Sequence, residues 1–417
     1  EMLRSLVGSE MCIRDRYKMK KILLLGGSRY LLPVIKSAHE LGLYVITCDY
    51  LPDNIAHKYS DEYVNVSIID KEAVLEVAKK LEIDGIMSFA TDPGVVTAAY
   101  VAEKLGLPSV GSYAAVSILQ NKGKFRKFLT ENGFNVPLAK SYKDIGLALK
   151  DKNLFKWPII IKPTDSAGSK GVKKVESFEQ MKSAIEYALS YSHNNEFIVE
   201  EFIEKKAFSS DSDSFSVNGE LKFVSFSSQQ FDVNAVNPYT PSAYSWPSSI
   251  CKENQNVLVS ELQRLIKLLG LGTSIYNIEV RESMEGIPYI MEVSPRGGGN
   301  RLAEMLRYAT GVDLIKGAVK AAVGENVDHI EQKDFNGHWA EAILHSYKPG
   351  IFAGLEISSE INGNVVEKDL WLEEGNFVGG FEGANEAIGT LVLKFEDSSQ
   401  LARVMNNLDN YIKINVI

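Results

Sequence analysis

The chain has 417 residues, of which 45% are hydrophobic and 24% charged, the composition of a globular protein of about three domains. Its formal net charge of -9 argues against a surface for nucleic acid, and no apolar run is long enough to span a membrane, so we expect neither partner. The three cysteines, Cys12, Cys48 and Cys251, form no CxxC or Cys/His cluster, which argues against a zinc site or a disulfide framework and favours a cytoplasmic protein.

Residues 1–18 do not resemble the rest of the chain. They read EMLRSLVGSEMCIRDRYK, begin without Met and lack the apolar core of a signal peptide. Met19 then opens a segment that reads as a natural start. We expect residues 1–18 to be a non-native leader that resembles translated adapter sequence, with a disordered native tail as the alternative.

Strand-like and helix-like segments alternate between residues 19 and 113. The apolar runs predict strands over residues 21–27, 43–50, 62–68 and 84–90, and helices over residues 31–42, 71–82 and 93–106. This alternation predicts a parallel sheet wrapped by helices, which binds ligands at the carboxyl ends of its strands.

Those strand ends would carry Gly26, Gly27 and Ser28, then Asp49, then Thr91 with Asp92. Asp49 stands where an acid that binds ribose would lie, but the glycines do not form a GxGxxG fingerprint. An NAD-dependent oxidoreductase is therefore a minor alternative.

The next segment combines lysines with small residues. Residues 117–133 predict one helix that ends at Gly133, before an extended stretch into Pro137. An apolar strand over residues 157–163 carries Lys162 and is followed by the loop DSAGSKG, whose backbone N–H groups could cradle phosphates. The loop lacks the spacing of a Walker A motif, and a flexible hairpin tip is the alternative.

Two apolar runs flank Glu285 and Gly286. A hairpin with this pair as a two-residue turn places Met284 opposite Ile287 and Glu279 opposite Glu292. A four-residue turn over residues 283–286 would shift the pairing by one step and keep both carboxylates on one face. Opposed carboxylates repel each other, and Mg²⁺ between them removes the conflict. A surface hairpin with two unrelated acids is the alternative.

An arginine and three glycines follow the second run. Ser294, Pro295 and Arg296 come first, and then Gly297 to Gly299 lead to Asn300. We expect Asn300 to cap a helix that stops at Gly311. Arginine and a helix N-terminus both favour anions. An ordinary glycine-rich turn is the alternative.

Together these segments resemble the ATP-grasp superfamily, whose metal-binding end has an acid on one strand, an acid on the next, and then x-Asn-x-Arg. Glu279, Glu292 and Arg296 match this pattern, and Ser294 stands where most members have asparagine. The resemblance implies that Glu279 and Glu292 hold one or two Mg²⁺ ions, with Mn²⁺ as a substitute and Ser294 as a third candidate ligand.

The resemblance also implies an ATP site. Lys122, favoured over Lys124 by its spacing to Gly133, would reach the α-phosphate, and Lys162 would bind α/β-phosphate oxygens. The remaining implied ATP contacts are the lid residues Ser166, Gly168, Ser169 and Gly171, and the adenine and ribose contacts Glu200, Glu201, Ile203 and Glu204. For Glu204 an acidic surface strand is the alternative, and many relatives have a further acid where this chain has Ala207.

The implied architecture is a multidomain protein of α/β and α+β parts. A parallel-sheet pre-ATP-grasp domain would span residues 19–113, an ATP-grasp domain residues 114–324 with a mobile lid at about 155–203, and a small α+β cap residues 325–417. The polar, aromatic segment over residues 227–250 would be an ordered loop near the substrate.

The implied activity is that of an ATP-dependent carboxylate–amine ligase, which forms a C–N bond through an acyl phosphate. Arg296 would stabilise the transferring phosphoryl group, and Arg301 would hold a substrate carboxylate. The partners would be a small carboxylic acid and a small amine, with a homodimer left open. The alternatives are a bicarbonate-activating, carboxylase-like relative and a nucleotide-binding protein that has lost catalysis.

Overall fold

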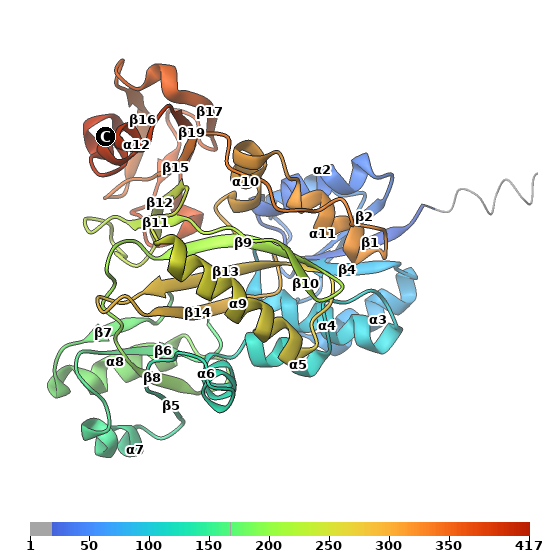
Figure 1. The fold of residues 1–417 in the computed structure, drawn as a ribbon. Helices are drawn as coiled ribbons and strands as arrows, with labels where there is room; N and C mark the ends of the chain where they lie inside the picture. The colour runs from blue at the N-terminus through green and yellow to red at the C-terminus, as the bar shows by residue number, and fades with distance from the viewer. Residues whose placement is uncertain (1–18, 167) are drawn as a thin grey trace, which may run out of the picture.

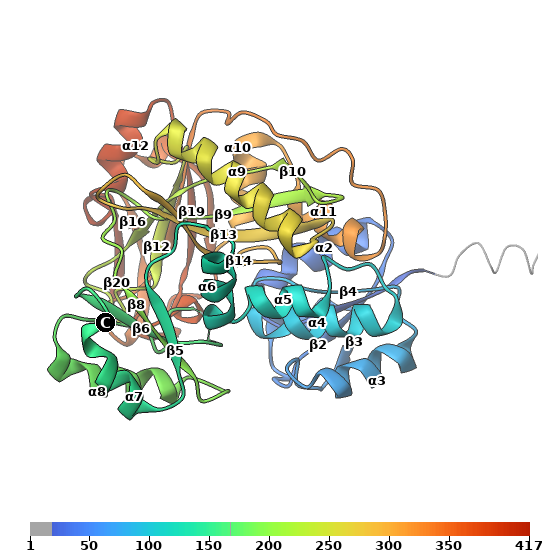
Figure 2. The ribbon, with the colours of Figure 1, turned by 60° about the horizontal axis from the view of Figure 1, so that its bottom comes forward.

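The computed structural model describes residues 19–166 and 168–417, so the predicted leader, residues 1–18, lies outside the described residues. Figure 1 shows a central antiparallel sheet with the first part of the chain, in blue and cyan, at one end. Residues 139–201, in green, lie below this sheet, and the C-terminal segment, in red, lies above it. In Figure 2 two short helices of residues 113–131 lie between the blue and the green parts.

The first domain is a parallel sheet between helices, as the sequence predicts. Its strands have the spatial order β3-β2-β1-β4, and its elements are β1 (Lys21–Leu25), β2 (Tyr44–Cys48), β3 (Glu62–Val64), β4 (Gly85–Ser88), α2 (Leu32–Glu40), α3 (Lys71–Leu81) and α4 (Asp92–Leu105). Side chains of β1 alternate between two cores, since Ile22 packs with α2 whereas Leu23 packs with α3 and α4. Both faces of the sheet are therefore covered by helices.

The helix predicted over residues 117–133 is two helices, α5 (Tyr113–Leu119) and α6 (Lys122–Glu131). Asn121 separates them, because its side-chain oxygen accepts a hydrogen bond from the Lys124 N–H and caps α6. The prediction of one helix missed this cap. Lys122 is consequently the first residue of α6, at the end of a helix that favours anions.

Residues 139–201 form a small antiparallel sheet with a core of its own, in the order β5-β8-β6-β7. Its elements are β5 (Ala139–Tyr142), β6 (Ile159–Pro163), β7 (Lys173–Val175), β8 (Phe197–Glu201), α7 (Ile145–Lys150) and α8 (Phe178–Ser190). Ile159, Met181 and Phe197 are buried together in that core. The sheet includes β5, which precedes the lid predicted at residues 155–203.

The central sheet is antiparallel, in the order β10-β9-β13-β14. Its elements and the helices that follow in the chain are β9 (Ser210–Val217), β10 (Glu220–Phe223), α9 (Lys252–Leu269), β13 (Ser274–Glu282), β14 (Pro288–Ser294), α10 (Leu302–Thr310) and α11 (Leu314–Ala322). Ile278 and Val280 of β13 pack with Leu262 of α9. Because side chains alternate along a strand, Asn277 and Glu279 point to the opposite face.

The turn between β13 and β14 differs from the predicted two-residue turn. The Ser283 N–H donates to the Ile287 carbonyl at 2.9 Å, so the connection is three residues long, 284–286. Gly286 has a φ of +77°, in the left-handed region that such a turn requires. The predicted pairing of Met284 with Ile287 is therefore wrong.

A β-bulge in β14 brings Glu292 back into register with Glu279. Met291 is an extra residue on β14, and beyond it Glu279 lies directly opposite Glu292. The predicted pairing of these two acids is confirmed, but it arises from a longer turn and a compensating bulge.

The helix after the glycines begins later than predicted. Asn300 and Arg301 both have left-handed φ values, +50° and +56°, and α10 starts at Leu302. Asn300 is therefore not the N-cap. Gly311 ends the helix in a left-handed conformation, with a φ of +77°, as predicted.

The C-terminal cap is an α+β unit whose larger sheet includes part of the predicted ordered loop, residues 227–250. This sheet has the order β11-β12-β15-β19-β17, and a second sheet has the order β18-β16-β20. The elements are β11 (Ser228–Phe231), β12 (Pro241–Trp246), β15 (His338–Leu344), β16 (Gly350–Ile357), β17 (Val365–Leu370), β18 (Phe377–Val378), β19 (Gly389–Phe395), α12 (Ser398–Met405) and β20 (Ile412–Val416). The predicted fold class is confirmed. None of the helices in the described part of the chain combines the length and the apolarity needed to cross a membrane.

We expect Gly286→Ala to lower the free energy of unfolding by about 1 kcal/mol, because a Cβ is strained at a φ of +77°. The space is open, since the nearest atom to an added Cβ lies at 3.9 Å. Gly286→Asn should lose less, because asparagine tolerates this conformation. Chemical denaturation measures both variants, and equal losses would contradict the backbone explanation.

Candidate active site

Six polar side chains form two rows across β9, β13 and β14. The first row is Asp211, Glu279 and Glu292, and the second is Asp213, Asn277 and Ser294. Within each strand the two positions are two residues apart, so both rows lie on the face that α9 does not cover. This face therefore carries the acids of both rows, whereas Ile278 and Val280 lie on the other face.

Glu279 and Glu292 are only loosely paired with cations. Arg281 Nη2 lies 3.7 Å from Glu279 Oε1, and Lys122 Nζ lies 3.4 Å from Glu292 Oε2. About a third of each carboxylate side chain is exposed, 34% and 33%. Both carboxylates therefore keep lone pairs available to a metal ion.

Glu200 lies on β8, in the sheet of β5, β6, β7 and β8 that we call the lid sheet, and it holds two cations together. Its oxygens lie 2.8 Å from Lys162 Nζ and 2.9 Å from Arg126 Nε, and its side chain is 1% exposed. Burial alone would raise the pKa of Glu200, but Arg126 and Lys162 lower it to about 2. Both oxygens of Glu200 thus lie in ion pairs, and its predicted contact with adenine stays a prediction.

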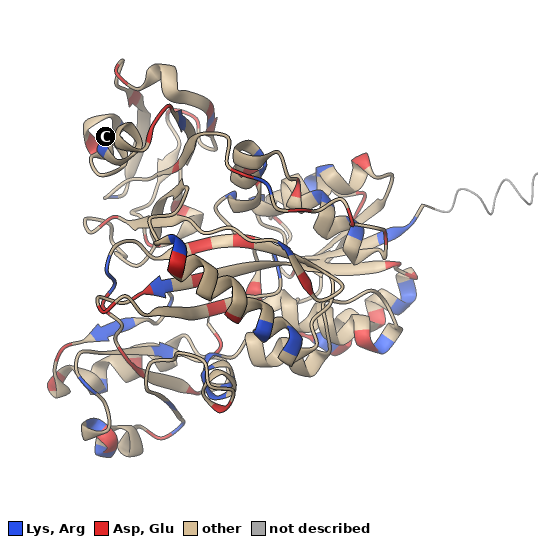
Figure 3. Cartoon of the chain, viewed as in Figure 1, with Lys and Arg blue, Asp and Glu red and all other residues tan. Residues whose placement is uncertain are grey.

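A cavity of about 50 Å³ brings most of the predicted site residues together. The predicted residues in its lining are Lys122, Lys162, Glu200, Glu201, Ile203, Glu279 and Glu292. They come from α6, β6, the end of β8, β13 and β14, which are far apart in the sequence. Figure 3 shows acidic positions on β9 of the central sheet and basic positions on β6 and β7 of the lid sheet.

The glycine and serine loop between β6 and β7 reaches this site through Lys122. Lys122 Nζ donates to the Ser166 carbonyl at 2.9 Å, and the Ser169 hydroxyl donates to the Tyr239 carbonyl at 3.1 Å. Gly168 and Gly171 adopt left-handed φ values of +66° and +72°. The loop thus bridges Lys122 and the segment before β12.

The end of β8 and the residues after it border the cavity. The Glu201 carboxylate accepts a hydrogen bond from the Lys156 N–H at 2.8 Å, and the Ile203 carbonyl accepts one from Arg281 at 3.3 Å. Glu204 is exposed and lies outside the cavity lining. Its carbonyl accepts a hydrogen bond from the Met284 N–H, at the tip of the β13–β14 hairpin.

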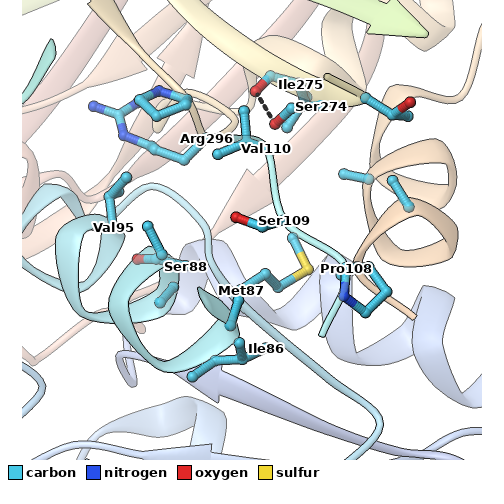
Figure 4. A pocket seen from close by; sticks show the side chains of 18 residues that line it. Ile86, Met87, Ser88, Val95, Pro108, Ser109, Val110, Ser274, Ile275 and Arg296 are labelled. Carbon is cyan, nitrogen blue, oxygen red and sulfur yellow. Dashed lines mark hydrogen bonds between the residues drawn. The ribbon is translucent and has the colours of Figure 1, made fainter. Parts of the chain in front are cut away.

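Arg296 forms a buried ion pair with Asp92 of the first domain. Its Nη2 lies 2.7 Å from Asp92 Oδ2, and its Nε donates to Oδ1 at 3.0 Å. Burial would raise the pKa of Asp92, but Arg296 lowers it. Figure 4 shows Arg296 beside a cavity of about 70 Å³ whose lining it shares with Ser88 and Val95.

The Ser294 hydroxyl is part of the same cluster. It donates to Asp92 Oδ1 at 2.7 Å and accepts a hydrogen bond from Gln120 Nε2 at 2.8 Å. Its proton and one lone pair are thus engaged across the domain boundary. The second lone pair is left over, so the role of Ser294 as a metal ligand stays a prediction.

Arg301 lies among other acids, away from the row of Asp211, Glu279 and Glu292. Its Nη2 is 2.6 Å from Glu367 Oε1 and 3.3 Å from Glu304 Oε1, and its Nη1 donates to Thr390 Oγ1 at 2.9 Å. The side chain is 8% exposed. These contacts give no support to the prediction that Arg301 holds a substrate carboxylate.

Several residues of the site were missed at the level of sequence. Arg126 lies one helical turn after Lys122 on α6, which is the spacing that places both on one face. Asp211 and Asp213 alternate with serines in SDSDS, a period of two that could have indicated a shared face. Burial raises the pKa of both aspartates to about 7, and Glu279 adds to the effect on Asp211.

The residues present fit Mg²⁺ that is shared with phosphates. Within residues 19–166 and 168–417, no three or more His, Cys, Asp or Glu side chains converge into a group that could hold a metal ion. Mg²⁺ in phosphate-transfer sites needs only one or two carboxylates, with phosphates and water as the other ligands. Glu279 and Glu292, opposite each other and partly exposed, are such a pair.

Two family models match this chain. One, described as an ATP-grasp domain, matches residues 155–304, and the other, described as an ATP-grasp N-terminal domain, matches residues 35–109. The chain carries an ATP-grasp domain. The predicted resemblance is confirmed, and the matched segment of this ATP-grasp protein contains Lys162, Glu279, Glu292 and Arg296.

Curated relatives of this ATP-grasp protein are longer than it is. The carbamoyl phosphate synthase large chain of Thermoanaerobacter sp. (strain X514) is 23% identical over 292 residues, which are 68% of this chain and 26% of that one. The same protein of Pseudothermotoga lettingae is 24% identical over 294 residues, 70% of this chain and 26% of that one. The ATP-grasp protein thus spans about a quarter of the length of these relatives.

Solved structures resemble the whole fold. The L-amino acid ligase from Bacillus licheniformis has a TM-score of 0.78 at 19% identity, over 96% of this chain and 100% of that one. The phosphoribosylglycinamide synthetase from Anaerococcus prevotii has a TM-score of 0.75 at 22% identity, over 96% and 100%. The biotin carboxylase domain of Hydrogenobacter thermophilus 2-oxoglutarate carboxylase, in complex with MgADP and bicarbonate, has a TM-score of 0.71 at 17% identity, over 96% and 92%. At these identities the likeness shows the fold.

We expect acid to destabilise this ATP-grasp protein through Glu200. The pKa of Glu200 is lowered from 4.5 to about 2 in the folded state, so its stabilising effect is complete above pH 4.5 and is lost as the pH falls toward 2. Glu200→Gln should be less stable at pH 7, because it leaves Arg126 and Lys162 buried without their counter-ion.

The same variant should lose less stability than the wild type between pH 4.5 and about 2, as followed by urea denaturation. Glu204→Gln, at an exposed position nearby, is the matched control and should follow the wild type. Parallel pH profiles for the wild type and Glu200→Gln would contradict the assignment.

Proposed function

We propose that this protein is an ATP- and Mg²⁺-dependent ligase that joins a carboxylate to an amine. The observation that supports it most is the single cavity in which Lys122 and Lys162 face Glu279 and Glu292. Two buried cations beside two paired carboxylates suit a nucleotide triphosphate with its metal ion. The activity itself is an inference from this chemistry and from the family.

The phosphate chain would lie between the lid sheet and the central sheet. Lys122 and Lys162 would neutralise phosphate oxygens, and the loop of Ser166, Gly168, Ser169 and Gly171 would cover them and exclude water. Lys122 already contacts the Ser166 carbonyl, which supports an approach of the loop to the phosphates. The backbone of Glu201 and Ile203 would face adenine, and Glu204 would approach the ribose on lid closure.

When bound between Glu279 and Glu292, Mg²⁺ would neutralise charge on the phosphates and align the group that is transferred. Arg296 would stabilise negative charge that develops on the phosphoryl group or on the tetrahedral carbon. To do so it would exchange part of its contact with Asp92 for a contact with the substrate. The protein thus contributes positioning and charge and no covalent nucleophile.

The reaction would take place in two steps. A carboxylate oxygen of the first substrate attacks the γ-phosphorus of ATP, and the bond from this phosphorus to the bridging oxygen breaks. ADP leaves, and the first substrate is now an acyl phosphate. The amine nitrogen of the second substrate then attacks the acyl carbon, phosphate leaves, and the proton of the attacking nitrogen passes to solvent. The similar fold of an L-amino acid ligase and of a phosphoribosylglycinamide synthetase supports this class of product.

We expect Lys162→Met to weaken the binding of Mg²⁺-ATP by about tenfold or more, because it removes a charge-assisted contact to phosphate. Glu200 keeps Arg126 as its partner in this variant, so the fold should be retained. Lys173→Met on β7, an exposed lysine outside the cavity lining, is the matched control. Isothermal titration calorimetry measures both, and an unchanged affinity in Lys162→Met would contradict the proposed phosphate site.

We expect release of phosphate from Mg²⁺-ATP to require one carboxylic acid together with one amine, in a screen of amino acids, dipeptides and small acids.

Arg296→Lys keeps a positive charge opposite Asp92 but loses the paired contact, and it should lower turnover by about 100-fold with unchanged ATP affinity. Equal losses of turnover and ATP affinity would contradict this role. A requirement for bicarbonate would favour the carboxylase-like alternative, and ATP binding without turnover on any mixture would favour the inactive alternative.

A further inference from the structure

A second, larger cavity of about 600 Å³ lies away from the proposed ATP site. One wall comes from the first domain, from the short turn Arg29–Leu31 and from α2, and the opposite wall comes from the start of α10 and from the end of β17 with Trp371. The volume is typical of sites for small molecules. Its lining includes none of the candidate ATP and metal residues Lys122, Lys162, Glu279 and Glu292.

One wall of this cavity carries an excess of acids. Arg301 and Glu304 line it, and Arg301 is shared between Glu304 and Glu367. Glu341 of β15 lies behind them, fully buried, and neither of its oxygens has a hydrogen-bond partner among the described residues. Three carboxyl groups therefore surround one guanidinium, and of the three only Glu304 lines the cavity.

Burial raises the pKa of the Glu304 and Glu341 carboxyls. A cation that binds at this wall would stabilise their ionised forms. The ammonium group of a ligand, with three N–H donors, suits the Glu304 carboxylate, which lines the cavity.

The wall from the first domain carries two cations that have no acid partner in the described part of the chain. Among the residues that the structure describes, neither Arg29 nor Lys36 has a carboxylate within ion-pair distance. The Arg29 guanidinium lies over the ring of Trp371, 5.3 Å from its centroid. The other two charged residues on this wall are neutralised locally, His39 by Asp61 and Glu40 by Lys316.

The space between the two walls is mainly apolar. Leu32, Pro33 and Ile35 of α2 line it, and the Trp371 ring closes it on the other side. An occupant with separated charges and an apolar body would match all three parts of the lining.

We propose that this cavity binds a zwitterion with apolar side chains, an amino acid or a short peptide, with its ammonium group at Glu304 and its carboxylate at Arg29 and Lys36. The proposal goes beyond the ligase function and does not depend on it, because it is drawn from residues outside the ATP site.

The cavity nevertheless borders the loop that follows Arg296. The Tyr30 hydroxyl donates to Asn300 Oδ1 at 3.0 Å, and a Cβ on Gly299 would lie 3.7 Å from the Tyr30 ring. Tyr30 lines the cavity as well. An occupant thus contacts a side chain that packs on the loop beside the proposed catalytic arginine.

The test measures binding of the zwitterion in the absence of ATP. Its result therefore does not depend on whether the protein is a ligase. The probes are L-leucyl-L-leucine, its N-acetyl derivative, which lacks the ammonium group, and its amide, which lacks the carboxylate. We expect the dipeptide to change the emission of Trp371 and each blocked analogue to bind about tenfold more weakly or worse. Trp371→Phe should remove the signal, while calorimetry still detects the dipeptide.

Two variants test the contribution of each wall to binding separately. Arg29→Ala combined with Lys36→Ala should weaken the dipeptide and leave the affinity of the amide unchanged, and Glu304→Gln should weaken the dipeptide and leave the affinity of the N-acetyl derivative unchanged. Lys80→Ala, an exposed lysine on α3 outside the cavity, is the matched control. Equal binding of all three probes, or no binding of the dipeptide at millimolar concentration by calorimetry, would overturn the proposal.

Discussion

The register of β13 against β14 is the constraint on which the proposed active site depends. Two carboxylates can share one cation only if they leave neighbouring strands on the same face and at the same height. The apolar contacts of Ile278 and Val280 with α9 fix the face, and the bulge at Met291 fixes the height. A bulge interrupts the ladder of a buried sheet, so its position next to Glu292 is consistent with a functional role.

The charges around Glu279 and Glu292 come from separate parts of the chain, and the nearby cations are paired with anions. Lys162 and Arg126 share Glu200, and Arg296 is balanced by Asp92. A buried charge without a partner would cost several kcal/mol, which approaches the stability of a whole domain. Pairing therefore allows several cations to lie close together before any polyphosphate is present, at sites that a ligand can reach by exchanging partners.

Local patterns predicted much of this structure, and contacts between distant segments did not follow from them. The hydrophobic periods of the first domain predicted its strands and helices, and the spacing around Glu285 predicted that Glu279 and Glu292 meet. Asn121 was missed because a single capping side chain decides between one helix and two. The strands β11 and β12 were missed because β12 joins the sheet through β15, which lies about a hundred residues later in the chain. Around Arg301, Glu304 is a local partner three residues later, whereas Glu367 comes from the cap and no spacing in the sequence links it to Arg301.

The ion pair between Asp92 and Arg296 gives the anion site a built-in competitor. Asp92 belongs to the first domain and Arg296 to the strand end of another, so an anion that binds Arg296 must replace a carboxylate that is already well aligned. A weakly charged inorganic ion gains little from such an exchange, whereas a group with more charge and a matching pair of oxygens gains more. The pair would therefore act as a threshold that excludes common solutes from the site.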